Sequence, residues 1–100
     1  MTKEPRAFSA EVHDPQGRQV VVLRGDLDLA SAPELERLCE RVPGDALLLD
    51  LRALEFLDSS GLAVLLREAA ERRVILEHPN ELVLRILETT GVLDRFEVRR

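Results

Sequence analysis

Apolar and polar residues alternate along the chain with two different periods. Near the start, Phe8, Ala10 and Val12 alternate with polar residues, which indicates a half-exposed strand. Later apolar runs are continuous and rich in valine or leucine, as expected of strands that are buried on both faces. This pattern predicts five strands, over residues 8–12, 20–23, 46–51, 74–77 and 96–98.

Three other segments carry apolar residues at every third or fourth position, as amphipathic helices do. The first has a start signal, because Ser31 and Glu34 match a capping box. In the second, Glu68 and Arg72 form a favourable pair four residues apart. The pattern predicts helices from Ser31 to Pro43-Gly44, from about Ser60 to Arg72, and from Pro79-Asn80 to Gly91.

The predicted elements follow the order β-β-α-β-α-β-α-β, which is typical of an α/β fold with a partly parallel sheet. A turn at residues 14–17 predicts that the first two strands form a hairpin. The 100 residues suffice for one domain, with residues 1–6 as a loose end. Three Phe and no Tyr or Trp predict an aliphatic core.

Charge and cysteine content narrow the functional classes. The net charge of −5 disfavours binding to nucleic acid or to an anionic membrane surface. Cys39 is the only cysteine and lies on the apolar face of the first helix, so we expect an inert, buried thiol. Without a signal peptide or an apolar run of roughly 20 residues, a cytoplasmic location is expected. The Arg72-Arg73 and Arg99-Arg100 pairs are interpreted as solvated ends.

The stretch Asp58-Ser59-Ser60-Gly61 places small polar residues where a strand gives way to a helix. The first N–H groups of a helix lack partners and carry partial positive charge, so a phosphate would be stabilised there. Gly61, with no side chain, would let a partner approach the turn. On spacing alone, the simpler interpretation is that Asp58 or Ser59 caps the helix.

Two segments resemble the STAS domain of anti-sigma factor antagonists. Gly25–Pro33 is similar to the family stretch between the second strand and the first helix. Leu49–Leu51, Phe56–Leu62 and Leu65-Leu66 are similar to the family's strand, loop and D-S-S/T-G-L signature. The resemblance implies a STAS fold, with a mixed four- to five-stranded sheet and helices mainly on one face.

The resemblance also implies a regulatory function without enzymatic activity or a cofactor. The unphosphorylated protein would bind an anti-sigma factor that is also a serine kinase with a histidine-kinase-like ATPase fold, and so free a sigma factor. Phosphorylation of Ser59 would release the complex, and a phosphoserine phosphatase would reset it. By position, the partner-binding residues would be Asp28, Asp58, Ser60, Gly61 and Leu62.

A second STAS role stays open, that of a subunit bound structurally to the ATPase of a lipid-transport complex. The presence of Ser59 favours the switch. A hydrolase is disfavoured because only His13 and His78 could act as bases, and neither has the neighbours of a metal site. The chain departs from the family pattern between Leu66 and Pro79, where about seven residues, or two helical turns, are missing.

Overall fold

The computed structural model describes residues 7–100, so the expected loose end at residues 1–6 lies outside the described residues. Two short 3-10 turns, Pro15–Gly17 and Leu93–Arg95, accompany the regular elements. The strands are β1 (Ser9–His13), β2 (Val20–Leu27), β3 (Ala46–Leu57), β4 (Arg73–Glu77) and β5 (Glu97–Arg99). The helices are α1 (Ala32–Arg41), α2 (Ser59–Glu71) and α3 (Glu81–Thr89). The predicted order of elements is confirmed.

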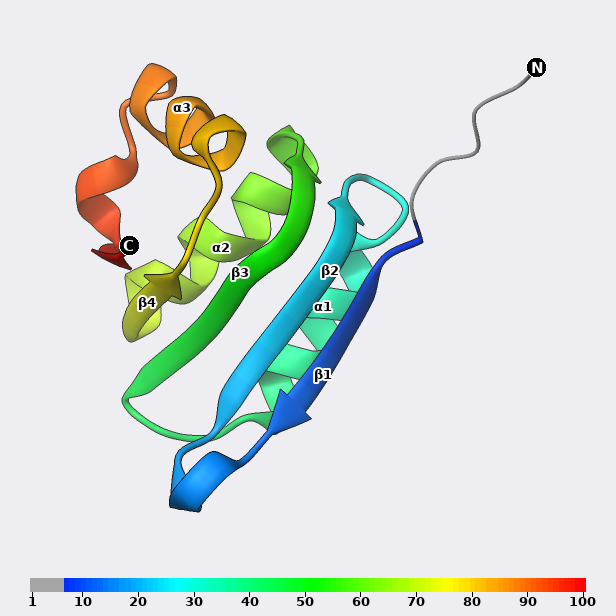
Figure 1. The fold of residues 1–100 in the computed structure, drawn as a ribbon, viewed down its shortest axis with the longest axis vertical. Helices are drawn as coiled ribbons and strands as arrows, with labels where there is room; N and C mark the ends of the chain where they lie inside the picture. Colours follow the sequence, from blue (N-terminus) through cyan, green and yellow to red (C-terminus); the bar gives the residue numbers. More distant parts are fainter. Residues whose placement is uncertain (1–6) are drawn as a thin grey trace.

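The strands form one mixed sheet in the order β1-β2-β3-β4-β5. The hairpin partners β1 and β2 are antiparallel, whereas all later neighbours are parallel. Parallel neighbours need long connections, and α1, α2 and α3 supply them in turn. Figure 1 shows α1 and α2 behind the sheet, with the opposite sheet face toward the viewer. The predicted α/β architecture is therefore confirmed.

The core lies between the sheet and its helices and is almost wholly aliphatic. Each helix contributes one apolar stripe to it, and the strands contribute alternate side chains. Cys39 of α1 belongs to this core, and burial raises the pKa of its thiol to about 12. The largest buried side chains are Val21, Leu23, Leu27, Leu35, Leu47, Leu49, Leu51, Leu54, Leu57, Leu65, Leu76 and Leu87.

Two central strands extend beyond their predicted ends. β2 continues through Gly25, where the sequence indicated a boundary. Gly25 has φ +80°, and a Cβ there would lie 2.0 Å from the carbonyl oxygen of Ala7. The glycine therefore permits a close backbone approach inside the strand, where the β2–β3 register also shifts. β3 runs on to Leu57, so Leu27 and Leu57 pair side by side at the ends of both strands.

Arg72 is not a solvated end as predicted, because only 11% of its side chain is exposed. Its guanidinium donates to the Glu68 carboxylate, which confirms the predicted pair. It also donates to the carbonyl oxygens of Cys39 at 3.0 Å and Val42 at 2.7 Å, at the end of α1. The Arg72 side chain thus links the end of α2 to the end of α1. Its backbone is extended, so the chain leaves α2 at this residue and enters β4.

Candidate functional site

The candidate site lies at the edge of the sheet where β2 and β3 end together. Their final residues, Leu27 and Leu57, are paired, and the N–H of Asp58 donates to the carbonyl oxygen of Leu27 at 3.1 Å. Because parallel neighbours end at the same edge, the loop at residues 28–31 lies beside the junction at residues 58–61. Two segments that are 30 residues apart in the sequence therefore form one surface.

Asp58 joins these two segments through its carboxylate. Its Oδ1 accepts from the N–H groups of Ser60 at 2.9 Å and Gly61 at 3.0 Å, which makes it the N-cap of α2. Its Oδ2 accepts from the N–H of Leu29 at 3.1 Å, in the neighbouring loop. The interpretation of Asp58 as a cap is confirmed, and the same side chain also fixes the loop that follows β2.

Asp28 holds that loop from within. Its Oδ1 accepts from the N–H groups of Ala30 and Ser31, both at 3.1 Å. The predicted capping box at Ser31 is wrong, because Ser31 makes no side-chain cap bond to α1. Its hydroxyl instead accepts from the N–H of Asp28 and donates to the carbonyl oxygen of Asp26, both at 2.9 Å. The buried Ser31 side chain therefore stabilises the loop that precedes α1.

The two serines of the junction differ in exposure. Ser59 is exposed at the first position of α2, whereas Ser60 is half-buried at the second. Within residues 7–100, the Ser59 hydroxyl forms no hydrogen bond. Asp58 caps the helix through its own carboxylate, so the cap does not need the hydroxyl of the exposed Ser59. Of the two hydroxyls, that of Ser59 is the more accessible to a modifying enzyme.

Gly61 and Leu62 are buried, at the start of α2. A Cβ on Gly61 would lie 2.8 Å from the carbonyl oxygen of Leu27 and within 2.9 Å of the Leu27 and Leu57 side chains. The absent side chain therefore lets α2 approach the strand ends. Gly61 and Leu62 therefore lie beneath the surface, whereas Asp28, Asp58 and Ser60 are half-buried and form part of it.

Two exposed apolar side chains near the ends of β2 and β3 were not predicted from the sequence. Leu29, in the loop at residues 28–31, is 75% exposed, and Phe56, near the end of β3, is 38% exposed. A hollow of about 280 Å³ extends from Leu29 and Ser60 along the groove between α1 and α2. An ion pair between Glu36 and Arg67 lies at its lining. Leu27 and Leu29 occupy equivalent places in the local pattern, so the sequence did not distinguish the buried Leu27 from the exposed Leu29.

The expected anion site at the start of α2 is already filled by a protein carboxylate. Asp58 takes the N–H groups of the second and third helical positions, which a phosphate on Ser59 would otherwise use. Asp26, Asp28 and Glu55 add further negative charge nearby in the chain.

Among the described residues, no group of three or more His, Cys, Asp or Glu side chains could hold a metal ion. The described helices include none that is long and apolar enough to cross a membrane.

Residues 11–98 match the family model described as "Mlab, STAS domain". With its five-stranded mixed sheet and the strand-end loops described above, the chain belongs to the STAS-domain family. It is 39% identical over 64 residues to the anti-sigma-F factor antagonist RsfB of Mycobacterium tuberculosis. That match covers 61% of this chain and spans about half of the relative, 52% of its length.

Solved structures are similar over almost the whole chain. A crystal structure of an anti-sigma factor antagonist from Mycobacterium paratuberculosis matches with a TM-score of 0.83 and 28% identity, covering 98% of this chain and 90% of that one. The anti-sigma factor antagonist SpoIIAA in its unphosphorylated form matches with a TM-score of 0.66 and 24% identity, over 94% and 89% of the two chains. The SpoIIAA likeness shows the shared fold.

Proposed function

We propose that this chain is an anti-sigma factor antagonist in which Ser59 is the phosphorylation switch. Its unphosphorylated form binds an anti-sigma factor that is also a serine kinase of the histidine-kinase-like ATPase fold, and a sigma factor is freed. Phosphorylation of Ser59 releases the partner, and a phosphoserine phosphatase restores binding. The resemblance to RsfB and to the antagonist from M. paratuberculosis supports this function.

The observation that carries the proposal is the position of Ser59. It is exposed on the first residue of α2, and no hydrogen bond within residues 7–100 occupies its hydroxyl. A kinase can therefore reach the hydroxyl without opening the helix or the Asp58 cap. Ser60 is half-buried, which makes it the poorer substrate and a matched control.

The surface around Ser59 is suited to a partner that dissociates when a negatively charged phosphate is added to Ser59. The exposed side chain of Leu29, whose N–H is bonded to Asp58, offers apolar contact area at the junction, and Phe56 near the end of β3 is a second exposed apolar side chain. A phosphate adds about −1.5 to −2 charges at neutral pH, beside the Asp58 carboxylate. Because Asp58 already holds the helix N–H groups, the phosphate has little compensation there. It would instead be desolvated against the partner, which disfavours the complex.

Within this surface, Asp28, Asp58 and Ser60 are proposed as direct partner contacts. Gly61 and Leu62 are buried, so we assign them an indirect role in the same site. Gly61 sets the distance of α2 from the strand ends, and Leu62 anchors the first turn of α2 in the core. Changes at these two residues would therefore alter the presentation of Ser59.

The proposal is tested with the cognate anti-sigma factor, ATP, and intact-mass measurement of the wild type, Ser59→Ala and Ser60→Ala. We expect a mass gain of one phosphate in the wild type and in Ser60→Ala, and none in Ser59→Ala. Calorimetry then compares Ser59→Asp with Ser60→Asp. The Ser59 variant should bind the anti-sigma factor at least about tenfold more weakly, since the charge lies on the exposed contact residue. Phosphate uptake by Ser59→Ala would move the switch to another residue.

The alternative role, a structural subunit on the ATPase of a lipid-transport complex, makes a different prediction. In that role Ser59→Asp would leave the affinity for the partner ATPase unchanged, and incubation with the ATPase and ATP would add no phosphate. The exposure of the Ser59 hydroxyl favours the switch over this alternative.

A further inference from the structure

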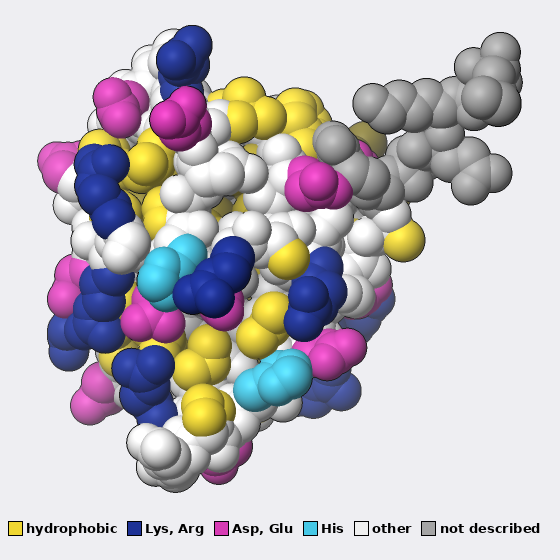
Figure 2. All heavy atoms as spheres, in the orientation of Figure 1, with side chains coloured by type: hydrophobic (Ala, Val, Ile, Leu, Met, Phe, Trp, Pro, Cys, Tyr) yellow, Lys and Arg dark blue, Asp and Glu magenta, His cyan; other side chains and the backbone are white. Residues whose placement is uncertain are grey.

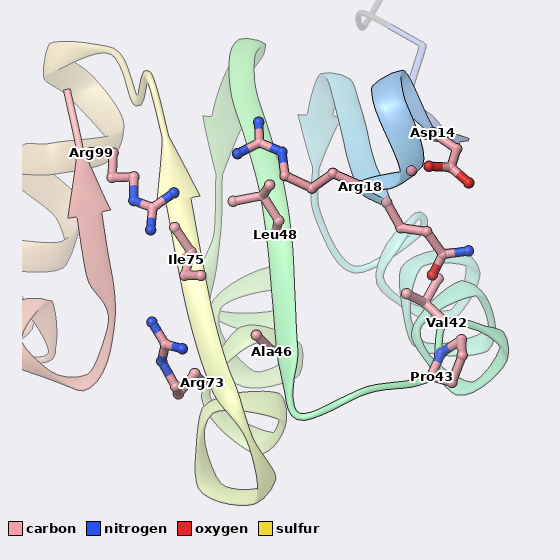
Figure 3. Close-up of a pocket in the computed structure, with 11 residues that line it drawn as sticks. Asp14, Arg18, Val42, Pro43, Ala46, Leu48, Arg73, Ile75 and Arg99 are labelled. Atoms are coloured by element: carbon pink, nitrogen blue, oxygen red, sulfur yellow. The ribbon is translucent and has the colours of Figure 1, made fainter.

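The sheet face opposite to α1 and α2 is largely closed by its own side chains. Figure 2 looks onto this face and shows charged side chains spread among hydrophobic ones. The apolar residues beneath them are only 6% to 7% exposed: Val20, Leu48 and Ile75. A hollow of about 770 Å³ lies there, and the arginines that Figure 3 shows around it pair with Glu77 and Glu97. Among the described residues, this face therefore offers a ligand little apolar surface and little unbalanced charge.

The edge of the sheet at β1 is different, because within residues 7–100 the strand is paired on one side only. Its one neighbour in the sheet is β2. Alternate N–H and carbonyl groups of Ser9–His13 therefore point away from the sheet. An edge of this kind can accept a further strand.

The side chains of β1 give this edge two distinct faces, because successive residues of a strand point to opposite sides of the sheet. Phe8 and Ala10 pack against the main core, so Val12 lies on the same, helix-covered side, where it is 42% exposed. Glu11 and His13 lie on the open face, with carboxylate and imidazole 3.2 Å apart. Their side chains are 60% and 49% exposed.

We propose that β1 pairs with β1 of a second copy of this chain, antiparallel and centred on Val12. About a twofold axis, the central residue lies opposite its own copy, and the residues before and after it lie opposite each other. Glu11 would then lie opposite His13 of the second copy. An imidazole offers an N–H to a carboxylate in either protonation state. Two carboxylates and two imidazoles would therefore alternate around a closed square, with the two Val12 side chains in contact on the other face.

This self-complementary pattern selects both the occupant and the register. Pairing centred on Glu11 would set two carboxylates directly opposite each other, which is destabilising. Pairing centred on Ala10 would set Glu11 opposite Ser9 and leave His13 without a carboxylate across the strand. A strand of another protein would need the reverse order of acid and base, which a second copy supplies by symmetry. The ladder is short, so we expect weak association, with a dissociation constant of about 0.1–1 mM.

The β1 edge is distant from the Ser59 surface. Val12 pairs with Val21 of β2, and that strand continues to Leu27 before the loop of the candidate site begins. An extended strand covers about 20 Å between these two positions of β2. Pairing at β1 leaves Ser59 exposed, so this proposal stands or falls independently of the switch.

The first test follows the mass of the full chain by sedimentation equilibrium at neutral pH, at concentrations up to about 2 mM. The wild type should change from monomer to dimer as the concentration rises. Glu11→Lys and His13→Glu should each weaken the association at least about tenfold, and the double variant Glu11→Lys/His13→Glu should restore it. Glu40→Lys, an equal change of charge at an exposed position of α1, should leave it unchanged. All three positions are exposed, so the variants should keep the wild-type melting temperature.

Cysteine substitution then tests the register. Residues directly opposite each other in antiparallel strands have Cα atoms about 4.5–5.5 Å apart, a separation that a disulfide spans. Val12→Cys should therefore form a disulfide-linked dimer under mild oxidation, whereas Ala10→Cys should not. Cys39 is buried and is present in both variants. The proposal is overturned by a wild type that stays monomeric over the whole range, by a double variant that does not restore association, or by cross-linking at Ala10→Cys that equals cross-linking at Val12→Cys.

Discussion

Removal of the Asp58 carboxylate should loosen the site and weaken the fold by a predictable amount. In Asp58→Ala, α2 loses its N-cap, which accepts from Ser60 and Gly61, at a cost of about 1 kcal/mol. The same change removes the bond from Leu29 that joins the two loops, at a cost of about 1 kcal/mol. The free energy of unfolding should therefore fall by about 2 kcal/mol in total.

Asp58→Asn separates the two contributions. An asparagine caps a helix as well as an aspartate does, so its oxygen can keep the bonds from Ser60 and Gly61. Its amide nitrogen would then face the N–H of Leu29, donor against donor, and that bond is lost. The loss for Asp58→Asn should be about 1 kcal/mol, or half that of Asp58→Ala.

Urea and thermal unfolding followed by circular dichroism measure both variants against the wild type. For a domain of this size, 1 kcal/mol corresponds to roughly 4–8 °C, so Asp58→Ala should melt about 10 °C below the wild type. Amide exchange at Leu29 should accelerate in both variants, and at Ser60 and Gly61 only in Asp58→Ala. Equal stability of Asp58→Ala and wild type, or equal losses in the two variants, would refute the assignment of two separate roles.

Three further predictions concern the support of the site. Gly61→Ala forces a Cβ against Leu27 and should cost about 1–3 kcal/mol in a urea titration; a neutral result would mean that α2 shifts freely. Arg72→Met, measured in the same way, should cost about 3 kcal/mol, because the largely buried carboxylate of Glu68 and the carbonyl groups at the end of α1 lose their donor. A loss below about 1 kcal/mol would contradict this. Burial raises the pKa of the Cys39 thiol from its ordinary value of 9 to about 12. The neutral thiol therefore makes its full contribution to stability below pH 9. As pH rises from 9 to 12 the free energy of unfolding should fall, by at most about 1.4 kcal/mol per pH unit. With no Tyr and one Lys in the chain, Cys39→Ala should flatten most of this slope in unfolding experiments, and an unchanged slope would exclude the thiol as its cause.

The fold could be predicted from the sequence because its signals are local. Apolar periodicity and turn residues lie within each segment, and they place every helix and strand in order. The full length of β3 was not predicted, because Arg52 and Glu55 interrupt its apolar run. Both are exposed positions of one continuous strand. Ends of strands are set by pairing with neighbours, which the local pattern does not contain.

At the site, the sequence indicated the two loops and the serine but not the bonds that join them. Asp58 was one of two residues, with Ser59, expected to cap the helix, and its bond to Leu29 depends on β2 and β3 ending in register. Ser31 matched a local capping motif, yet its hydroxyl bonds within the preceding loop. Arg72 was taken as solvated because its carbonyl partners lie about 30 residues away, at the end of α1.

The most direct test of the central claim compares the affinity of one protein preparation for its anti-sigma factor before and after phosphorylation, with the modified residue located by fragment mass spectrometry. We expect phosphate on Ser59 and a dissociation constant at least about tenfold larger after modification, reversed by phosphatase treatment. An unchanged dissociation constant with Ser59 fully phosphorylated would contradict it.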